Sequence, residues 1–270
     1  MYRKPVTTAM PKPLFKWVGG KRSFFRKQQT VIPRFGGRYL EPFAGGIAFF
    51  LGLIRRDGPQ RMPVIADLNQ HLISTYQDVV GHQSEVLMHL RDIYHSMPRP
   101  TTAEMALHAH SQLHKSRRTP ERPIDERSCE CDDYRLIRKS LRERQVPHYK
   151  EIYRLIPTGG PMAAASFIFT MNHAWNGLYR VDSSGAFNTP MGFERWKDFE
   201  PDEANFFAVA KALETAQLLT QPWERTVEMA SPGDFIFLDP PYASELKYQG
   251  ATKYNTKKDV FCYEDHIRMI

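Results

Sequence analysis

The sequence predicts an α/β fold in which a parallel sheet is covered by helices on both faces and is interrupted by a helical insert. Helical patterns separate four short apolar runs that each end in polar residues. These runs are residues 38–43, 64–67, 218–222 and 235–239. Continuous apolar strands of this kind are typical of parallel sheets buried on both faces. From Leu72 to about Phe169, helix-forming residues, histidines and positive charge replace the alternation, so we expect a helical insert there.

Composition narrows the class of protein. The 270 residues include 37 Lys and Arg against 30 Asp and Glu, and a net charge of +7 favours a polyanionic partner. Three cysteines are too few and too badly spaced for a disulfide framework or paired zinc sites, which suits a reducing cytosol. The first residues lack an apolar leader, and 18 apolar residues never run together. We therefore expect an unexported cytoplasmic protein that does not enter the membrane.

The sharpest motif is Asp239-Pro240-Pro241-Tyr242, which directly follows the last apolar run. Such a run delivers the Asp239 carboxylate to the end of the sheet where open α/β sheets bind ligands. Two prolines fix the backbone and remove two donors, so the neighbouring carbonyls become fixed acceptors. Taken alone, Asp-Pro-Pro is also a common way to open a turn.

This tetrapeptide suits chemistry on an amino group conjugated to an aromatic ring, such as that of adenine. A carboxylate and a carbonyl that accept its two N–H bonds free the nitrogen lone pair to attack a methyl group on a sulfonium. Asp239 and the Pro240 carbonyl fit these roles, and Tyr242 fits stacking on a base flipped out of a duplex. We expect direct transfer without a covalent enzyme intermediate or a metal.

A second motif runs from Tyr39 to Gly46 and continues into a helical pattern. A strand, a glycine turn and a helix in this order let the backbone approach a ligand closely. About 20 residues later the run 64–67 ends in Asp67, the position from which a carboxylate binds ribose hydroxyls. Nicotinamide-binding proteins have similar spacing, but Gly-x-Gly-x-x-Gly is not present.

Together the motifs resemble the Dam-type family, the D12 class of adenine-specific DNA methyltransferases. Four ordered stretches carry the resemblance. They are Phe15–Lys21, Glu41–Gly46, Asn176–Arg180 with Phe187–Gly192, and Asp239–Tyr242. The resemblance implies a Rossmann-like methyltransferase sheet, site-specific methylation of the 6-amino nitrogen of adenine in double-stranded DNA, and S-adenosylmethionine as the methyl donor. Enzymes of this class occur in restriction-modification and in epigenetic systems.

The resemblance also implies roles for individual residues. Lys21 would lie near the carboxylate of the donor and Asp67 at its ribose, while Trp17 could equally be a core aromatic. The expected donor-binding residues are Trp17, Lys21, Glu41, Pro42, Phe43, Gly45, Asp67 and Asp239. The expected catalytic residues are Asp239, Pro240, Pro241 and Tyr242.

Residues 175–192 resemble the DNA-reading hairpin of the family, with a turn at 182–185. Arg180 has the fork that reads guanine, and Trp175 could wedge into the stack opened by flipping. The expected DNA-binding residues are Trp175, Asn176, Leu178, Arg180, Asn188 and Pro190, and three of them match positions associated with GATC. Phosphate contacts or ordinary solvated charge explain Lys115, Arg117, Arg118, Arg138, Arg142 and Arg144. His108, His110 and His114 are better explained by a solvated helix face than by a metal site.

We divide the chain into a catalytic core at 1–71 and 193–270 and a target-recognition insert at 72–192. Two features depart from the family. Ile47 replaces a small residue and could crowd the donor. The C-terminal strands of a seven-stranded sheet are missing after 242, which would leave the run 235–238 as an edge unless a partner chain completes the sheet. The alternatives are a truncated homologue that binds DNA without catalysis, and a methyltransferase acting on protein glutamine.

Overall fold

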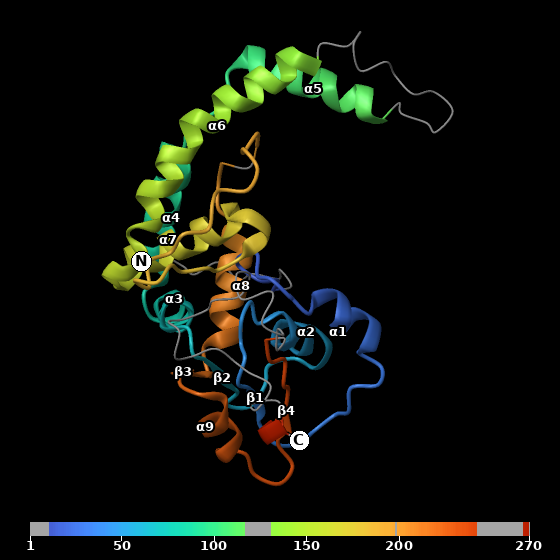
Figure 1. Cartoon of the computed structure of the whole chain (residues 1–270). Helices are drawn as coiled ribbons and strands as arrows, with labels where there is room; N and C mark the ends of the chain where they lie inside the picture. The colour runs from blue at the N-terminus through green and yellow to red at the C-terminus, as the bar shows by residue number, and fades with distance from the viewer. Residues whose placement is uncertain (1–10, 117–130, 198, 242–266, 270) are drawn as a thin grey trace, which may run out of the picture.

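A computed structural model describes residues 11–116, 131–197, 199–241 and 267–269 of the chain (Figure 1). Its sheet has four parallel strands in the order β3-β2-β1-β4. The strands are β1 Tyr39–Glu41, β2 Val64–Asp67, β3 Gln217–Thr220 and β4 Phe235–Ile236. Each strand lies inside one of the predicted apolar runs or begins one residue before it, so the predicted α/β fold is confirmed.

The side chains of the central strands are covered by protein on both faces of the sheet. All of β1 is buried, and so are the first three residues of β2. In register, Leu40 pairs with Val64 of β2 and with Ile236 of β4. Within the described residues β4 lies at the edge of the sheet, and the Leu238 side chain that follows it is 39% exposed. A strand or partner chain beyond this edge stays a prediction.

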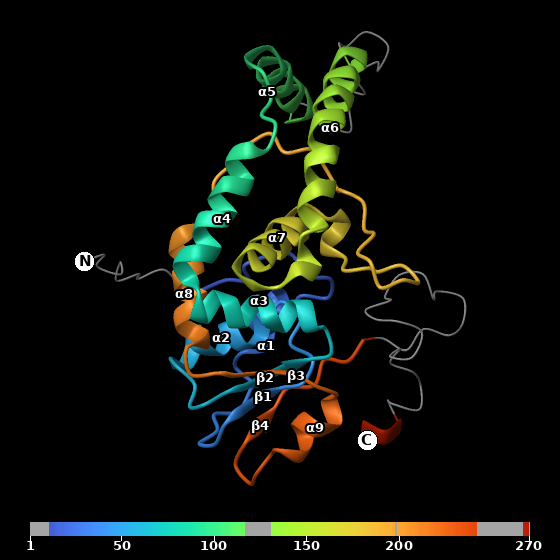
Figure 2. The same ribbon diagram turned by 90° about the vertical axis from the view of Figure 1, so that its left-hand side faces the viewer.

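Helices cover both faces of the sheet, as the apolar strands require. Figure 2 shows α2, α3 and α8 on one face and α9 on the other. Contacts join α3 to β2, β3 and α8, and α9 to β1 and β2. The helices of this part of the fold are α1 Arg22–Gln28, α2 Ala48–Asp57, α3 Gln70–Gly81, α8 Glu203–Leu213 and α9 Trp223–Glu228.

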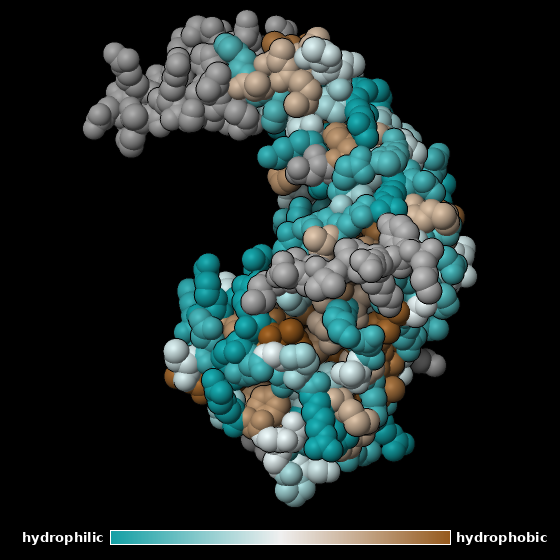
Figure 3. Space-filling view, turned by 180° about the vertical axis from the view of Figure 1, so that it is seen from behind, coloured by the Kyte–Doolittle hydropathy of each residue, from teal (hydrophilic) through white to brown (hydrophobic). Residues whose placement is uncertain are grey.

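Between α3 and α8 the described residues form helices and a hairpin, as predicted. The helical elements are α4 Gln83–Ser96, α5 Thr102–Ser116, α6 Cys131–Tyr153, η1 Ile156–Thr158, α7 Gly160–His173 and η2 Trp175–Gly177. The largely apolar α7 is buried against α3, α4 and α6. The described parts of α5 and α6 form an arm that curves away from the body. A hollow lies between this arm and the body (Figure 3).

The start of the arm is fixed by a capping box. Thr101 Oγ1 accepts from the Glu104 amide at 3.3 Å, and Glu104 Oε2 accepts from the Thr101 amide at 2.7 Å. Glu104 also pairs with Arg144 of α6, which ties the two helices of the arm together. Among the helices of the described ranges, none has the length and apolar character needed to cross a membrane.

Candidate active site

Three carboxylates meet at the carboxyl end of the sheet. Glu41 ends β1, Asp67 ends β2, and Asp239 follows β4 by three residues. Parallel neighbouring strands bring these ends to one edge, so the site follows from the topology. The Lys21 ammonium lies 2.7 Å from Asp239 Oδ2 and also donates to the Gly19 carbonyl at 2.8 Å. The structure thus brings two predicted site residues into direct contact from opposite ends of the sequence.

The glycine turn after β1 is held over this edge by its neighbours. The Gly45 amide donates to Asp67 Oδ2 at 3.1 Å, and the Gly45 carbonyl accepts from the Tyr76 hydroxyl at 2.8 Å. Gly45 has φ +45°, and a Cβ there would lie 2.7 Å from Trp17 Nε1. Only glycine fits between Trp17 and the turn. Trp17 also stacks on Phe167 and Tyr179, so it both packs on the core and covers the predicted donor loop.

The turn ends at Ile47, and the expectation that this side chain crowds the donor is wrong. Ile47 is 1% exposed and belongs to the hydrophobic core beneath α2. Its backbone reaches that position with φ +48°, a left-handed conformation that is strained for a β-branched residue. Burial of the side chain compensates for this strain.

Burial controls the charge of the carboxylates. Glu41 is 3% exposed and its Oε2 atom has no hydrogen-bond partner in the described part of the chain. Desolvation raises the pKa of Glu41 well above 4.5; the nearby Tyr39 hydroxyl offsets part of this, and the charges of Asp239 and Asp67 add to it. Burial also raises the pKa of Asp67, although amide donors from Asn69 and Gly45 oppose the shift. A buried, unpartnered carboxylate oxygen is ready to accept a hydrogen bond or a positive charge.

Aromatic side chains and the prolines complete the rim of the site. Phe43 stacks on Trp223 at 6.5 Å between ring centroids, and Pro42 before it is buried. Sequence reasoning missed Trp223, whose signal is its place three residues after β3 ends. Pro240 and Pro241 follow Asp239 in a half-buried segment, whereas Tyr242 lies outside the described residues.

Beyond the sheet, residues 174–191 form the predicted hairpin. Isolated antiparallel bridges pair Ala174 with Met191 and Val181 with Phe187. The turn closes through the Gly185 amide, which donates to the Asp182 carbonyl at 3.1 Å. Figure 2 shows the hairpin projecting on the side from which β4 leaves the sheet.

The hairpin sorts its side chains onto two faces. Tyr179, Val181, Phe187 and Thr189 are buried. The predicted DNA-binding residues that alternate with them are exposed or half-buried, namely Asn176, Leu178, Arg180, Asn188 and Pro190. Arg180 is braced across the arms, because its Nε donates to Asn188 Oδ1 at 2.7 Å and its Nη2 to the Asn188 carbonyl at 3.0 Å. The outward face therefore carries a braced guanidinium among polar and apolar side chains.

Residues 191–197, here called the strap, run from the hairpin along the arm. Arg142 donates to the carbonyls of Met191 and Gly192, and Arg138 pairs with the Glu194 carboxylate. Arg144 pairs with Glu104 in the same way. These three arginines therefore bind carbonyls and carboxylates of the chain itself, although phosphate contacts were one expectation for them. These bonds give the three arginines a structural role, and phosphate contact by their remaining donors stays a prediction.

For His108 of the arm, the expected solvated helix face is corrected to a packed one. His108 stacks on Trp196 of the strap at 4.2 Å and its Nδ1 lies 3.0 Å from the Tyr134 hydroxyl. In the described ranges, no group of three metal-binding side chains occurs. The strap thus joins hairpin and arm, so their contacts cross the predicted boundary at 192/193, and the division into domains stays a prediction.

Comparison with known families identifies the family to which this chain belongs. The family model of the D12 class N6 adenine-specific DNA methyltransferases matches residues 17–269, which spans the lysine motif, the carboxylate edge, the insert and the hairpin. The chain belongs to this family. It is accordingly a DNA adenine methyltransferase, and DNA is its substrate. A family model specific for DNA methylation gives no support to the glutamine alternative.

Relatives of this family align along almost the whole chain. The type II methyltransferase M.MjaIII of Methanocaldococcus jannaschii is 28% identical over 96% of this chain and 78% of its own length. The type II methyltransferase M1.LlaDCHI of Lactococcus lactis subsp. cremoris is 26% identical over 96% and 74%. The DNA adenine methylase of Escherichia coli K12 is 22% identical over 96% and 75%. The similarity therefore includes type II methyltransferases as well as DNA adenine methylases.

Proposed function

We propose that this D12 methyltransferase transfers a methyl group from S-adenosylmethionine to the 6-amino nitrogen of adenine in a short, GATC-like site of double-stranded DNA. The observation that supports this most is the meeting of Glu41, Asp67 and Asp239 with Lys21 at one edge of the sheet. That edge lies beside the Gly45 turn, which is packed against Trp17 and bonded to Asp67.

The residues at this edge fit the proposed methyl donor. S-adenosylmethionine supplies an electrophilic methyl group on a positively charged sulfur. Asp67 at the end of β2 would accept from the ribose hydroxyls, and the unpartnered Glu41 Oε2 is a buried acceptor for a cationic or hydroxyl group. Lys21 would bind the donor carboxylate, and Trp17 with Phe43 would supply apolar walls. The acidic edge and the single ammonium match a ligand that carries both charges.

Asp239 and the Pro240 carbonyl would act on the target base. Both would accept N–H bonds from the adenine amino group, which makes its nitrogen lone pair available for attack on the methyl carbon. The 2.7 Å pair with Lys21 holds the Asp239 side chain in place before DNA arrives. Binding of the donor carboxylate by Lys21 would weaken this pair and leave Asp239 to accept from adenine. Donor binding would therefore prepare the site for the base.

The hairpin would read the DNA. Its outward residues Arg180, Leu178 and Pro190 present a guanidinium fork and apolar contacts, which suit the edge of guanine and the methyl group of thymine. The Arg180–Asn188 hydrogen bonds would hold the fork in position before DNA binds. Trp175 is 46% exposed at the base of the hairpin, and we assign it to the space left in the base stack.

The test is transfer of labelled methyl from S-adenosylmethionine to unmethylated DNA by the full chain, followed by mapping of the modified base. Duplexes with and without GATC and the corresponding single strands are compared. We expect methyladenine at one short duplex site. Asp239→Ala should abolish transfer and leave DNA affinity within about twofold, whereas Asp92→Ala on the exposed face of α4 should change neither. Transfer by Asp239→Ala at the normal rate would remove Asp239 from the mechanism. DNA binding without transfer by the unaltered chain would favour the non-catalytic alternative.

A further inference from the structure

We propose that Phe193 of the strap acts with Trp175 as a two-ring platform that stacks on a nucleobase of the DNA substrate. This inference rests on the proposed function and adds a residue that the motif comparison did not single out. Phe193 is 68% exposed and Trp175 is 46% exposed, and their ring centroids lie 5.6 Å apart. Among the described residues no phenylalanine or tryptophan is more exposed than Phe193.

An exposed aromatic pair is less common than a single exposed ring. Burying a phenylalanine side chain stabilises a protein by about 1.5–3 kcal/mol, and contiguous exposed apolar surface is typical of contact sites. The neighbours of Phe193 show that burial was available. Met191 is 2% exposed, and the Glu194 side chain is 5% exposed in its pair with Arg138. The chain buries the residues around Phe193 and leaves its ring in solvent.

The backbone on both sides of the two rings is fixed. The Trp175 amide donates to the Pro190 carbonyl at 3.0 Å, and the Gly192 amide donates to the His173 carbonyl at 2.8 Å. Arg142 of the arm donates to the carbonyl of Gly192, the residue before Phe193. A surface that must order itself on binding loses affinity, whereas these contacts hold the pair in place in advance.

Basic residues on the same hairpin and strap favour nucleic acid over a protein partner. The outward face of the hairpin carries Arg180, and the strap carries Arg195 two residues after Phe193. Flat aromatic faces within a cationic surface match bases on a phosphate backbone. In the proposed reaction the target adenine leaves the stack, so two further faces become available to protein rings: those of the base pairs on either side of the gap. Trp175 would enter this gap, and Phe193 would extend the stack beside it.

The platform can be tested by binding as well as by turnover. The probe is a duplex that carries one GATC site, the site of the proposed function, with 2-aminopurine in place of its adenine. Because base–aromatic stacking contributes roughly 1–3 kcal/mol, Phe193→Ala should weaken duplex binding about 5- to 150-fold and reduce the fluorescence increase that reports flipping. Phe193→Trp should keep the affinity and the fluorescence increase of the unaltered chain, whereas Phe193→Leu should lose both, as Phe193→Ala does. Met88→Ala, an exposed apolar control on α4, should match the unaltered chain.

The outcomes separate this proposal from the proposed function. Equal affinity and fluorescence for Phe193→Ala and the unaltered chain would overturn the platform, and so would full restoration by Phe193→Leu, which cannot stack. Since the binding readout needs no turnover, a chain that binds the duplex but transfers no methyl group would refute the proposed catalysis while the Phe193 comparison still decides the platform. Failure of the unaltered chain to bind duplex DNA would refute both. Affinity for S-adenosylmethionine should be the same in every variant, because Phe193 lies on the strap and not at the sheet edge.

Discussion

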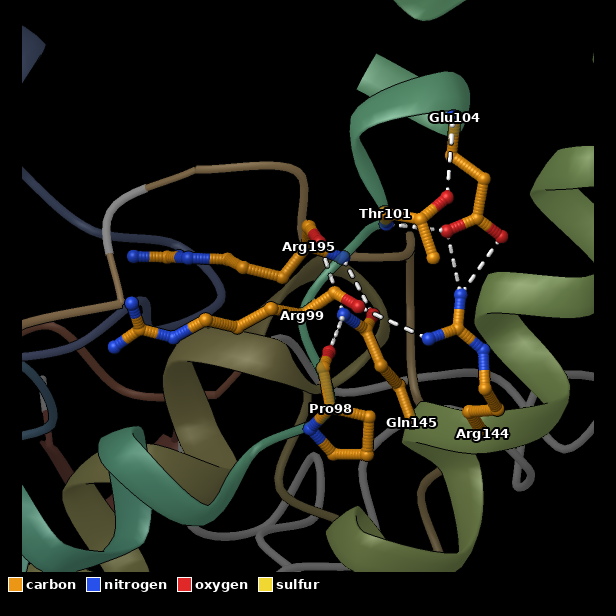
Figure 4. Close-up of polar contacts among 7 residues, drawn as sticks. All are labelled: Pro98, Arg99, Thr101, Glu104, Arg144, Gln145 and Arg195. Atoms are coloured by element: carbon orange, nitrogen blue, oxygen red, sulfur yellow. Dashed lines mark hydrogen bonds and ion pairs between the residues drawn. The ribbon is translucent and has the colours of Figure 1, made fainter.

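Replacing Gln145 with leucine should loosen the attachment of the strap to the arm. Gln145 lies on α6 and is fully buried. Its Nε2 donates to the carbonyls of Pro98 and Arg195 at 2.8 and 2.9 Å, and its Oε1 accepts from the Arg195 amide at 2.7 Å (Figure 4). One side chain therefore joins the segment before α5, the helix α6 and the strap.

The size of the effect follows from these three bonds. A typical protein hydrogen bond contributes about 1 kcal/mol, and a buried backbone group left without a partner costs roughly 1–3 kcal/mol. Pro98 and Arg195 are only half-buried, so water would replace part of what is lost. Leucine has nearly the volume of glutamine, so no large cavity adds to the loss. We expect Gln145→Leu to lower the free energy of unfolding by about 2–4 kcal/mol.

Urea denaturation followed by tryptophan fluorescence measures this change, because Trp196 belongs to the strap. The matched control is Gln77→Leu, since Gln77 is exposed on α3 and makes one hydrogen bond to the Leu218 carbonyl. It should cost under about 1 kcal/mol. If the two variants were destabilised equally, the buried amide would not hold the strap. Gln145→Leu should also weaken binding to duplex DNA, because the strap carries Phe193.

Three further predictions concern charge and recognition. His173 is buried, and desolvation is the main cause that lowers its pKa to about 3. Below about pH 6.5 the unfolded chain therefore binds a proton that the folded chain does not, and the free energy of unfolding decreases as the pH is lowered. In urea titrations, His173→Phe should reduce the stability lost between pH 7 and pH 4 by about 3 kcal/mol. An unchanged pH profile would contradict this assignment. Lys21→Ala should weaken S-adenosylmethionine binding in calorimetry by about tenfold or more, and an unaltered affinity would assign the lysine only to Asp239. Arg180→Ala should relax discrimination at one base pair by about 1–3 kcal/mol in methylation of substituted duplexes, whereas uniform weakening on all sequences would mean a phosphate contact.

Local pattern was enough to locate the strands and the chemistry at their ends. The apolar runs that became β1 and β2 had to be buried on both faces, and parallel pairing carried Glu41 and Asp67 to one edge. The hairpin turn at 182–185 was equally local, because Asp182 and Gly185 hold the chain through short-range hydrogen bonds. These features depend on neighbours in sequence, and so sequence alone predicts them.

Long-range packing decided the rest. Positive charge on α6 predicted contacts with phosphate or solvent, but the strap brings carbonyls and a carboxylate within reach of Arg138 and Arg142. A β-branched residue after the glycine turn suggested crowding of the donor, yet the left-handed backbone of Ile47 turns that side chain into the core. The buried amide of Gln145 and the outward ring of Phe193 leave no local signal either. Sequence determined which groups this methyltransferase carries to the edge of its sheet. Tertiary structure decided which arginines bind acceptors of the chain itself and which aromatic rings stay exposed, because these contacts depend on segments that meet only in the folded chain.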